Sequence, residues 1–115
     1  MLERRLVRVC VAAVTGLLLA GTAASTIRAS TAPQPRVIVI ENMQFSPQSL
    51  IVKAGEQITW VNKDLFPHTA TADAKSFDSR AIAPNAAWTW VAAKPGTYAY
   101  GCTFHPTMKG TVTVQ

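Results

Sequence analysis

Short apolar runs separated by turn-forming residues fill the chain from residue 36 onwards. Residues 37–40 are all β-branched, and this run is too short for a helix and lacks a clean period of two. It predicts a strand that is buried on both faces or lies close to a sheet edge. Residues 50–53, 54–56 and 57–62 have the pattern of a strand, a tight turn and a second strand, which predicts a β-hairpin.

The next part of the chain is less regular. Residues 72–85 are rich in polar and small residues, so we expect a long connection with at most one short element, near Phe77. Residues 87–92 alternate again and place Trp88 and Trp90 on one face of a predicted strand. Packing in the core is the expected role of these two side chains.

A further strand leads to the cysteine. Tyr98, Tyr100 and Cys102 share one face of this strand, so the thiol is expected to point inwards where the strand ends. Residues 110–114 alternate as a last strand. Short strands without an amphipathic helix predict an all-β sandwich or barrel, formed as a single domain by residues 36–115.

The first 24 residues have the three parts of a secretory signal peptide: a basic start, an apolar stretch over residues 9–24 and small residues after it. Cleavage after Ala24, Ala29 or Ala32 fits this pattern. A retained membrane anchor is the alternative, but the stretch is shorter than the roughly 20 residues that a spanning helix needs. We therefore expect an exported, periplasmic protein whose residues 25–35 form a disordered lead-in.

Charge adds little to this picture. The whole chain carries a formal charge of +5, and from Ser25 onwards its basic residues are scattered singly rather than grouped with stacking aromatic residues. This distribution excludes a nucleic-acid-binding surface of the usual kind.

Cysteine content narrows the chemistry. Removal of the leader takes Cys10 with it and leaves Cys102 as the sole cysteine, which excludes an internal disulfide. An unprotected thiol is easily oxidised in an exported protein, whereas a metal-bound thiolate is occupied. A buried, inert cysteine is the alternative interpretation.

Cys102, His105 and Met108 follow one another at intervals of three, and His68 is the one other histidine of the chain. A thiolate, two imidazoles and a weak thioether are the donors of a blue copper centre. Zinc fits less well, because its sites do not use thioethers. A nucleophilic Cys/His pair would also need an oxyanion hole and a substrate cleft, for which the sequence gives no signal, so we do not expect an enzyme.

The sequence resembles the cupredoxins, and among them the amicyanins with their plastocyanin and azurin relatives, over nearly all of residues 36–115. The motifs that carry the resemblance are residues 39–45, 50–55, 58–62 and 67–68, and residues 96–110 with their short Cys-x2-His-x2-Met loop. The resemblance implies a Greek-key β-sandwich and one-electron transfer between larger redox proteins. It also implies a type 1 copper site with the ligands His68, Cys102, His105 and Met108.

Two positions depart from the amicyanin pattern. Thr69 replaces an asparagine that braces the ligand loop, and we expect its hydroxyl to bond to Thr103 instead. Phe104 replaces a proline and therefore has a backbone N–H. If this N–H points at the Cys102 sulfur, it predicts a higher reduction potential than in the proline-containing relatives.

Redox partners are expected to dock transiently around His105. The apolar side chains of Phe66 and Phe104, with Pro67 and Pro106, would surround the edge of its ring, although packing of both phenylalanines inside the domain is an equal alternative. We expect a monomer. The main alternative function is copper delivery or resistance without electron transfer.

Overall fold

The computed structural model describes residues 12–13, 16–17, 20–27 and 35–115. The chain divides into two units, Met1–Ser30 and Thr31–Gln115. The described residues of the first unit are exposed and form no helix or strand. No helix within the described ranges is long and apolar enough to cross a membrane. Most of the predicted signal peptide (1–24) and lead-in (25–35) lies outside the described residues, so these two assignments stay predictions.

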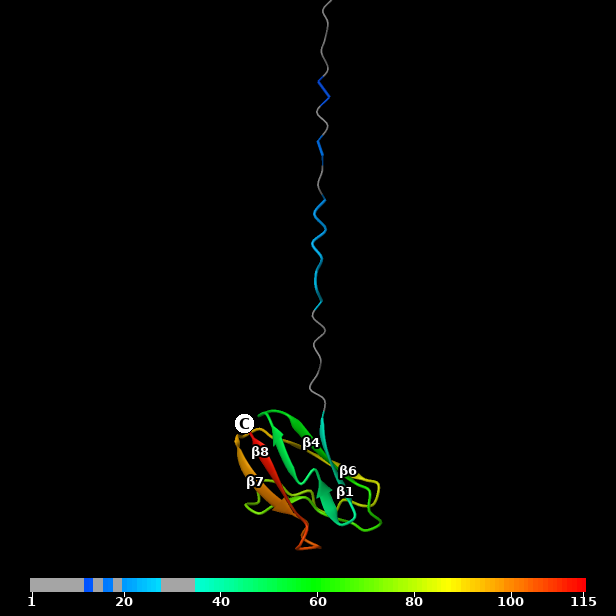
Figure 1. Ribbon diagram of the computed structural model, residues 1–115, viewed down its shortest axis with the longest axis vertical. Helices are drawn as coiled ribbons and strands as arrows, with labels where there is room; N and C mark the ends of the chain where they lie inside the picture. Colours follow the sequence, from blue (N-terminus) through cyan, green and yellow to red (C-terminus); the bar gives the residue numbers. More distant parts are fainter. Residues whose placement is uncertain (1–11, 14–15, 18–19, 28–34) are drawn as a thin grey trace, which may run out of the picture. The chain divides into compact units, whose positions relative to one another are not determined.

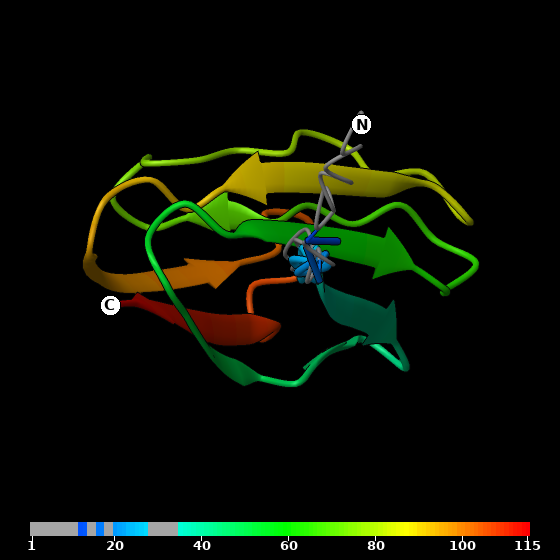
Figure 2. The ribbon, with the colours of Figure 1, turned by 90° about the horizontal axis from the view of Figure 1, so that it is seen from above.

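The second unit is a sandwich of two four-stranded sheets (Figure 1). The strands are β1 (Arg36–Glu41), β2 (Gln44–Ser46), β3 (Ser49–Val52), β4 (Gln57–Asn62), β5 (Thr71–Ala72), β6 (Ala87–Val91), β7 (Gly96–Gly101) and β8 (Lys109–Val114). One sheet has the order β2-β1-β4-β6 and the other β3-β8-β7-β5. Figure 2 shows β6, β4 and β1 side by side, with β7 and β8 as neighbours in the other layer. The predicted all-β sandwich is confirmed.

β1 has one buried face. Ile38 and Ile40 are fully buried, whereas Val37 on the opposite face is 48% exposed. β1 is second in its sheet, next to the three-residue edge strand β2. Of the two predicted positions for this strand, proximity to a sheet edge is the correct one.

The predicted hairpin over residues 50–62 is wrong, because β3 and β4 belong to different sheets. The tight turn itself is present: Glu56 N–H bonds to Lys53 O at 3.1 Å, and Gly55 has a φ of 92°. Each strand has an apolar face, and both faces point into the same core, so the two strands pack across the sandwich instead of pairing. The alternation along the sequence is the same in either arrangement.

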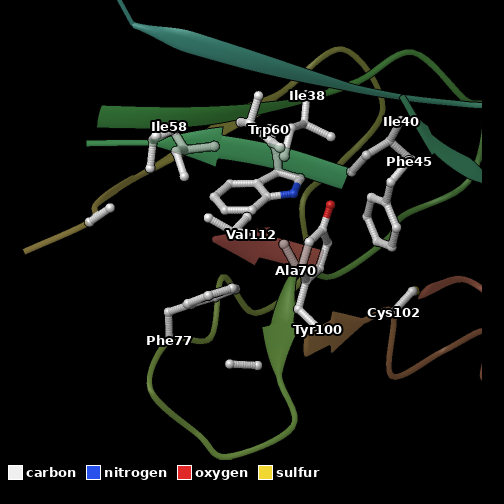
Figure 3. Close-up of a cluster of buried hydrophobic side chains, with 14 of the residues drawn as sticks. Ile38, Ile40, Phe45, Ile58, Trp60, Ala70, Phe77, Tyr100, Cys102 and Val112 are labelled. Carbon is white, nitrogen blue, oxygen red and sulfur yellow. The ribbon is translucent and has the colours of Figure 1, made fainter. Parts of the chain in front are cut away.

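Aromatic side chains fill the core (Figure 3). Trp60 is fully buried, and its ring centroid lies 5.6 Å from that of Trp88 and 5.5 Å from that of Phe77. Phe77 lies 4.4 Å from Trp90 by the same measure. The core role predicted for both β6 tryptophans is confirmed, and Phe77 anchors the long connection to the core.

Tyr100 and Cys102 point inwards from the end of β7, as predicted (Figure 3). The Tyr100 ring lies across Gly110 of β8, where an added Cβ would be 2.4 Å from the ring carbon Cζ. Gly110 pairs directly with Tyr100 in the β7–β8 ladder. This close fit fixes the two strands at the base of the loop that joins them.

Candidate metal centre

The loop between β7 and β8 carries three of the four predicted ligands. Cys102 N–H bonds to Met108 O at 3.2 Å, Met108 N–H to His105 O at 3.0 Å, and His105 N–H to Cys102 O at 3.3 Å. These bonds close the loop into a compact turn. Cys102 and Met108 are both 3% exposed, whereas His105 is partly exposed.

Gly101 makes the tight base of this loop possible. A Cβ at this position would lie 2.8 Å from the Met108 carbonyl oxygen, which is the atom that accepts the Cys102 N–H bond. Real Cβ atoms do not approach a backbone oxygen so closely, so any side chain here would displace the loop.

His68 lies in the connection between β4 and β5. Its backbone pairs with Ile82: His68 N–H bonds to Ile82 O at 3.2 Å, and Ile82 N–H bonds to His68 O at 2.7 Å. Its side chain is fully buried. The long connection thus holds this histidine inside the domain.

The donor atoms of these residues converge. The Cys102 Sγ atom lies 3.7 Å from His68 Nδ1 and 3.6 Å from His105 Nδ1, and all three donors lie within 4.8 Å of one another. Two donors that share one ion through bonds of about 2.0 to 2.3 Å are separated by roughly 3.5 to 3.8 Å at tetrahedral to trigonal angles. The three side chains therefore have the spacing that a single metal ion requires.

Met108 matches the predicted fourth ligand by donor type. It is buried at the end of the same loop, immediately before β8. Two imidazoles and a thiolate beside a thioether match the donors of a trigonal blue copper site with a weak axial ligand.

Asp64, which the sequence analysis missed, contacts one of the predicted ligands. Its Oδ2 atom lies 2.8 Å from His68 Nε2, and its two oxygens accept the N–H groups of Asn42 and Met43 at 2.8 and 3.0 Å. Burial tends to raise the pKa of this carboxyl, but these hydrogen bonds outweigh it and leave the pKa below its ordinary value. An ionised carboxylate can only accept a hydrogen bond, so Asp64 binds the Nε2 side of the ring, and Nδ1 is the nitrogen that faces the Cys102 sulfur.

Thr69 braces the cysteine. Its N–H donates to Cys102 Sγ at 3.3 Å, and its hydroxyl oxygen accepts the Thr103 N–H at 2.9 Å and lies 3.2 Å from the Thr103 hydroxyl. The predicted bond between the two threonines is confirmed. The hydrogen bond expected from the Phe104 N–H to the Cys102 sulfur is not formed. Within residues 35–115 the backbone N–H that reaches this sulfur is that of Thr69. The structure therefore gives no basis for the higher reduction potential that was expected from Phe104.

Apolar side chains are exposed beside the site. Phe66 is 61% exposed and Phe104 is 52% exposed, which rules out the alternative that both are packed inside the domain. Leu65, which the sequence analysis did not single out, is 88% exposed. We refer to Leu65, Phe66 and Phe104 as the apolar rim.

Comparison with known proteins gives one consistent answer. The family model of the cupredoxin-like domain matches residues 9–114. An amicyanin from Paracoccus versutus is 30% identical over a match that covers 82% of this chain and 76% of the amicyanin. A plastocyanin from Scenedesmus fuscus is 39% identical over a match that covers 62% of this chain and 86% of the plastocyanin. The solved Cu(I) form of a methionine-to-alanine variant of amicyanin superposes with a TM-score of 0.68, at 30% identity, over 76% of this chain and 88% of that one. The chain belongs to the cupredoxin family.

Proposed function

We propose that this protein is a blue copper electron carrier. His68, Cys102 and His105 would hold one copper ion, and Met108 would be the weak fourth ligand. The observation that carries the proposal is the pair of donor separations, 3.7 and 3.6 Å from the Cys102 sulfur to the two Nδ1 atoms. Copper would supply one-electron chemistry by alternating between Cu(I) and Cu(II).

The task of the protein in this chemistry is to keep its donors in place. Asp64 fixes the ring of His68, and Thr69 fixes the sulfur of Cys102. Since both supporting residues are themselves anchored by backbone hydrogen bonds, the donors have little freedom to rearrange when an electron arrives or leaves. Such rigidity suits an electron carrier rather than an enzyme that must bind and release a substrate.

Electrons would enter and leave at His105. Its ring is partly exposed, whereas the other two close donors are buried. The apolar rim would make a small, readily dissociated contact with a redox donor or acceptor, as transient redox complexes use interfaces of limited area. Phe104 directly precedes His105, and Phe66 lies two residues before His68.

The site of action would be the periplasm or another exported compartment. Residues 1–24 have the pattern of a signal peptide, and we propose that cleavage after residue 24, 29 or 32 releases the domain of residues 36–115 as a monomer.

Copper delivery is the competing function, and redox behaviour separates the two. The copper-loaded protein should be reduced and reoxidised repeatedly by mild reagents and should keep its metal in the presence of a moderate chelator. A protein that gives up copper readily and does not cycle would be a delivery protein instead.

A further inference from the structure

The long connection after β5 runs alongside the segment that carries His68. Backbone bonds join residues 77–82 to residues 68–72 in antiparallel fashion. Between the two ends of this contact, Ser79 N–H bonds to Ala70 O at 3.0 Å, and the Ser79 hydroxyl accepts the Ala70 N–H at 2.7 Å. The connection is therefore tied to the ligand segment along its length.

A line of hydroxyl groups crosses this contact. The Thr71 hydroxyl oxygen lies 3.0 Å from that of Thr69 and 3.1 Å from Asp78 Oδ1. Thr69 and Thr71 are buried, and Asp78 is exposed. Because Thr69 also accepts the Thr103 N–H, the line extends from a surface carboxylate to the residue that follows Cys102.

The Asp78 carboxylate orients the Thr71 hydroxyl. The Thr71 hydroxyl has one proton and two acceptors within reach, and an ionised carboxylate is the stronger acceptor. The Thr71 hydroxyl is shared between these two acceptors, and the ionised Asp78 carboxylate fixes the side-chain rotamer in which Thr71 also donates to the Thr69 oxygen. The Thr69 hydroxyl is then held from both ends, by Thr71 and by Thr103.

Asp78 is itself fixed. Its Oδ1 atom accepts the Arg80 N–H at 2.8 Å, and Arg80 adopts a left-handed backbone with a φ of 55°. The Arg80 N–H is the main reason that the pKa of Asp78 lies below its ordinary value. The carboxylate is thus ionised and oriented at neutral pH.

We propose that Asp78 is a positioning residue for the metal centre. Acting through Thr71 and Thr69, it holds the Thr69 N–H against the Cys102 sulfur. An N–H···S bond draws electron density from the thiolate and favours the reduced metal, so this line of residues would raise the reduction potential. The inference rests on the proposed copper function, but the Thr69 amide can be observed with or without metal.

The test uses two disrupting variants and two controls. Thr71→Val removes the hydroxyl with little change of shape, and Asp78→Ala removes the carboxylate. Thr71→Ser keeps the hydroxyl, and Thr89→Val removes a hydroxyl from the exposed pair that Thr59 and Thr89 form at 2.8 Å on the other sheet. Each protein is examined by the amide proton shift and hydrogen exchange of Thr69 in the copper-free state, and by the reduction potential after copper is added.

Thr71→Val and Asp78→Ala should both move the Thr69 amide proton upfield, speed its exchange and lower the potential, while both controls stay at the wild-type values. An unchanged amide in Thr71→Val would overturn the inference, and so would a raised potential in Asp78→Ala, because that is the direction in which the loss of a negative charge alone moves the potential. If none of the proteins takes up copper, the proposed function fails, yet the amide of Thr69 still decides whether Asp78 positions it.

Discussion

The Asp64 carboxylate lies 2.8 Å from Nε2 of the fully buried His68. The same carboxylate accepts the N–H groups of Asn42 and Met43, in the turn between β1 and β2. One side chain therefore ties a turn of the first sheet to a donor of the metal centre and fixes which nitrogen of His68 faces the sulfur.

Asp64→Asn should weaken copper binding about 10-fold to 100-fold, which is the usual effect of losing an outer partner of a ligating histidine. It should also raise the reduction potential, because the negative charge that the substitution removes stabilises Cu(II). Competition with a chelator and potentiometry measure the two effects. Asp73→Asn, which neutralises an exposed carboxylate, is the matched control and should change neither. Wild-type affinity and potential in Asp64→Asn would refute this role.

Gly101→Ala should disturb the ligand loop more than it disturbs the rest of the domain. The new Cβ would push the Met108 carbonyl away from the Cys102 N–H, at a cost of about 1 to 3 kcal/mol in the free energy of unfolding. Gly55→Ala is the control, since Gly55 has a positive φ but no atom within 4 Å of an added Cβ. Urea unfolding should show a loss of stability in both variants. The visible spectrum of the copper-loaded protein should change in Gly101→Ala and stay the same in Gly55→Ala. Identical spectra for both variants would contradict the argument.

Tyr100 should make the protein sensitive to alkali. Burial raises the pKa of Tyr100 to about 12, and the neighbouring Trp60 side chain opposes this rise. The folded state therefore favours the protonated phenol, and this contribution to stability is complete below pH 10 and is lost as the pH rises towards 12. Tyr100→Phe should reduce this alkaline loss, as measured by urea unfolding of the copper-free protein between pH 7 and pH 12.

At pH 7 the same substitution should cost little, because neither the Tyr100 hydroxyl nor the Trp60 indole N–H has a hydrogen-bond partner among residues 35–115. Tyr98→Phe is the comparison, since the Tyr98 hydroxyl donates to Lys94 O at 2.7 Å and its loss should cost about 1 kcal/mol. A larger loss at pH 7 in Tyr100→Phe than in Tyr98→Phe would show that the buried hydroxyl does have a stabilising partner.

Substitutions in the apolar rim should slow electron exchange without altering the metal centre. Electron self-exchange between oxidised and reduced copies, measured by NMR line broadening, needs no knowledge of the natural partner. Phe104→Ala and Phe66→Ala should lower this rate while the potential stays constant, because they weaken the contact beside His105. Val91→Ala is the control. Val91 is exposed and apolar but lies at the end of the β4–β6 ladder opposite to residues 61 and 87, so its substitution should leave the rate unchanged. Equal rates in all four proteins would remove the docking proposal.

The inward-facing side chains of the strands were predictable from the sequence, whereas the pairing of the strands was not. Alternation along β3 and β4 shows which side chains face the core. It does not show whether two successive strands pair within one sheet or pack across the sandwich, and here they pack across it.

The predicted site residues divide in a similar way. The donors within the Cys102 loop could be predicted because a short loop keeps them close together. The Thr69–Thr103 bond was expected from the family resemblance, because an asparagine at the position of Thr69 braces the ligand loop in the amicyanins. Asp64 was missed although it lies four residues before His68, because its other two partners come from the β1–β2 turn. The donor to the sulfur was assigned to Phe104 instead of Thr69 because the direction of a backbone N–H in an irregular loop depends on φ and ψ, which residue types do not determine.

The most direct test of the copper centre is the visible and EPR spectrum of the purified protein after addition of one equivalent of Cu(II), recorded beside that of Cys102→Ser. The account predicts an intense blue colour and narrow copper hyperfine splitting in the wild type, and the loss of both in the variant, which retains two imidazoles but has no thiolate. A colourless wild type, or a blue Cys102→Ser variant, would contradict it.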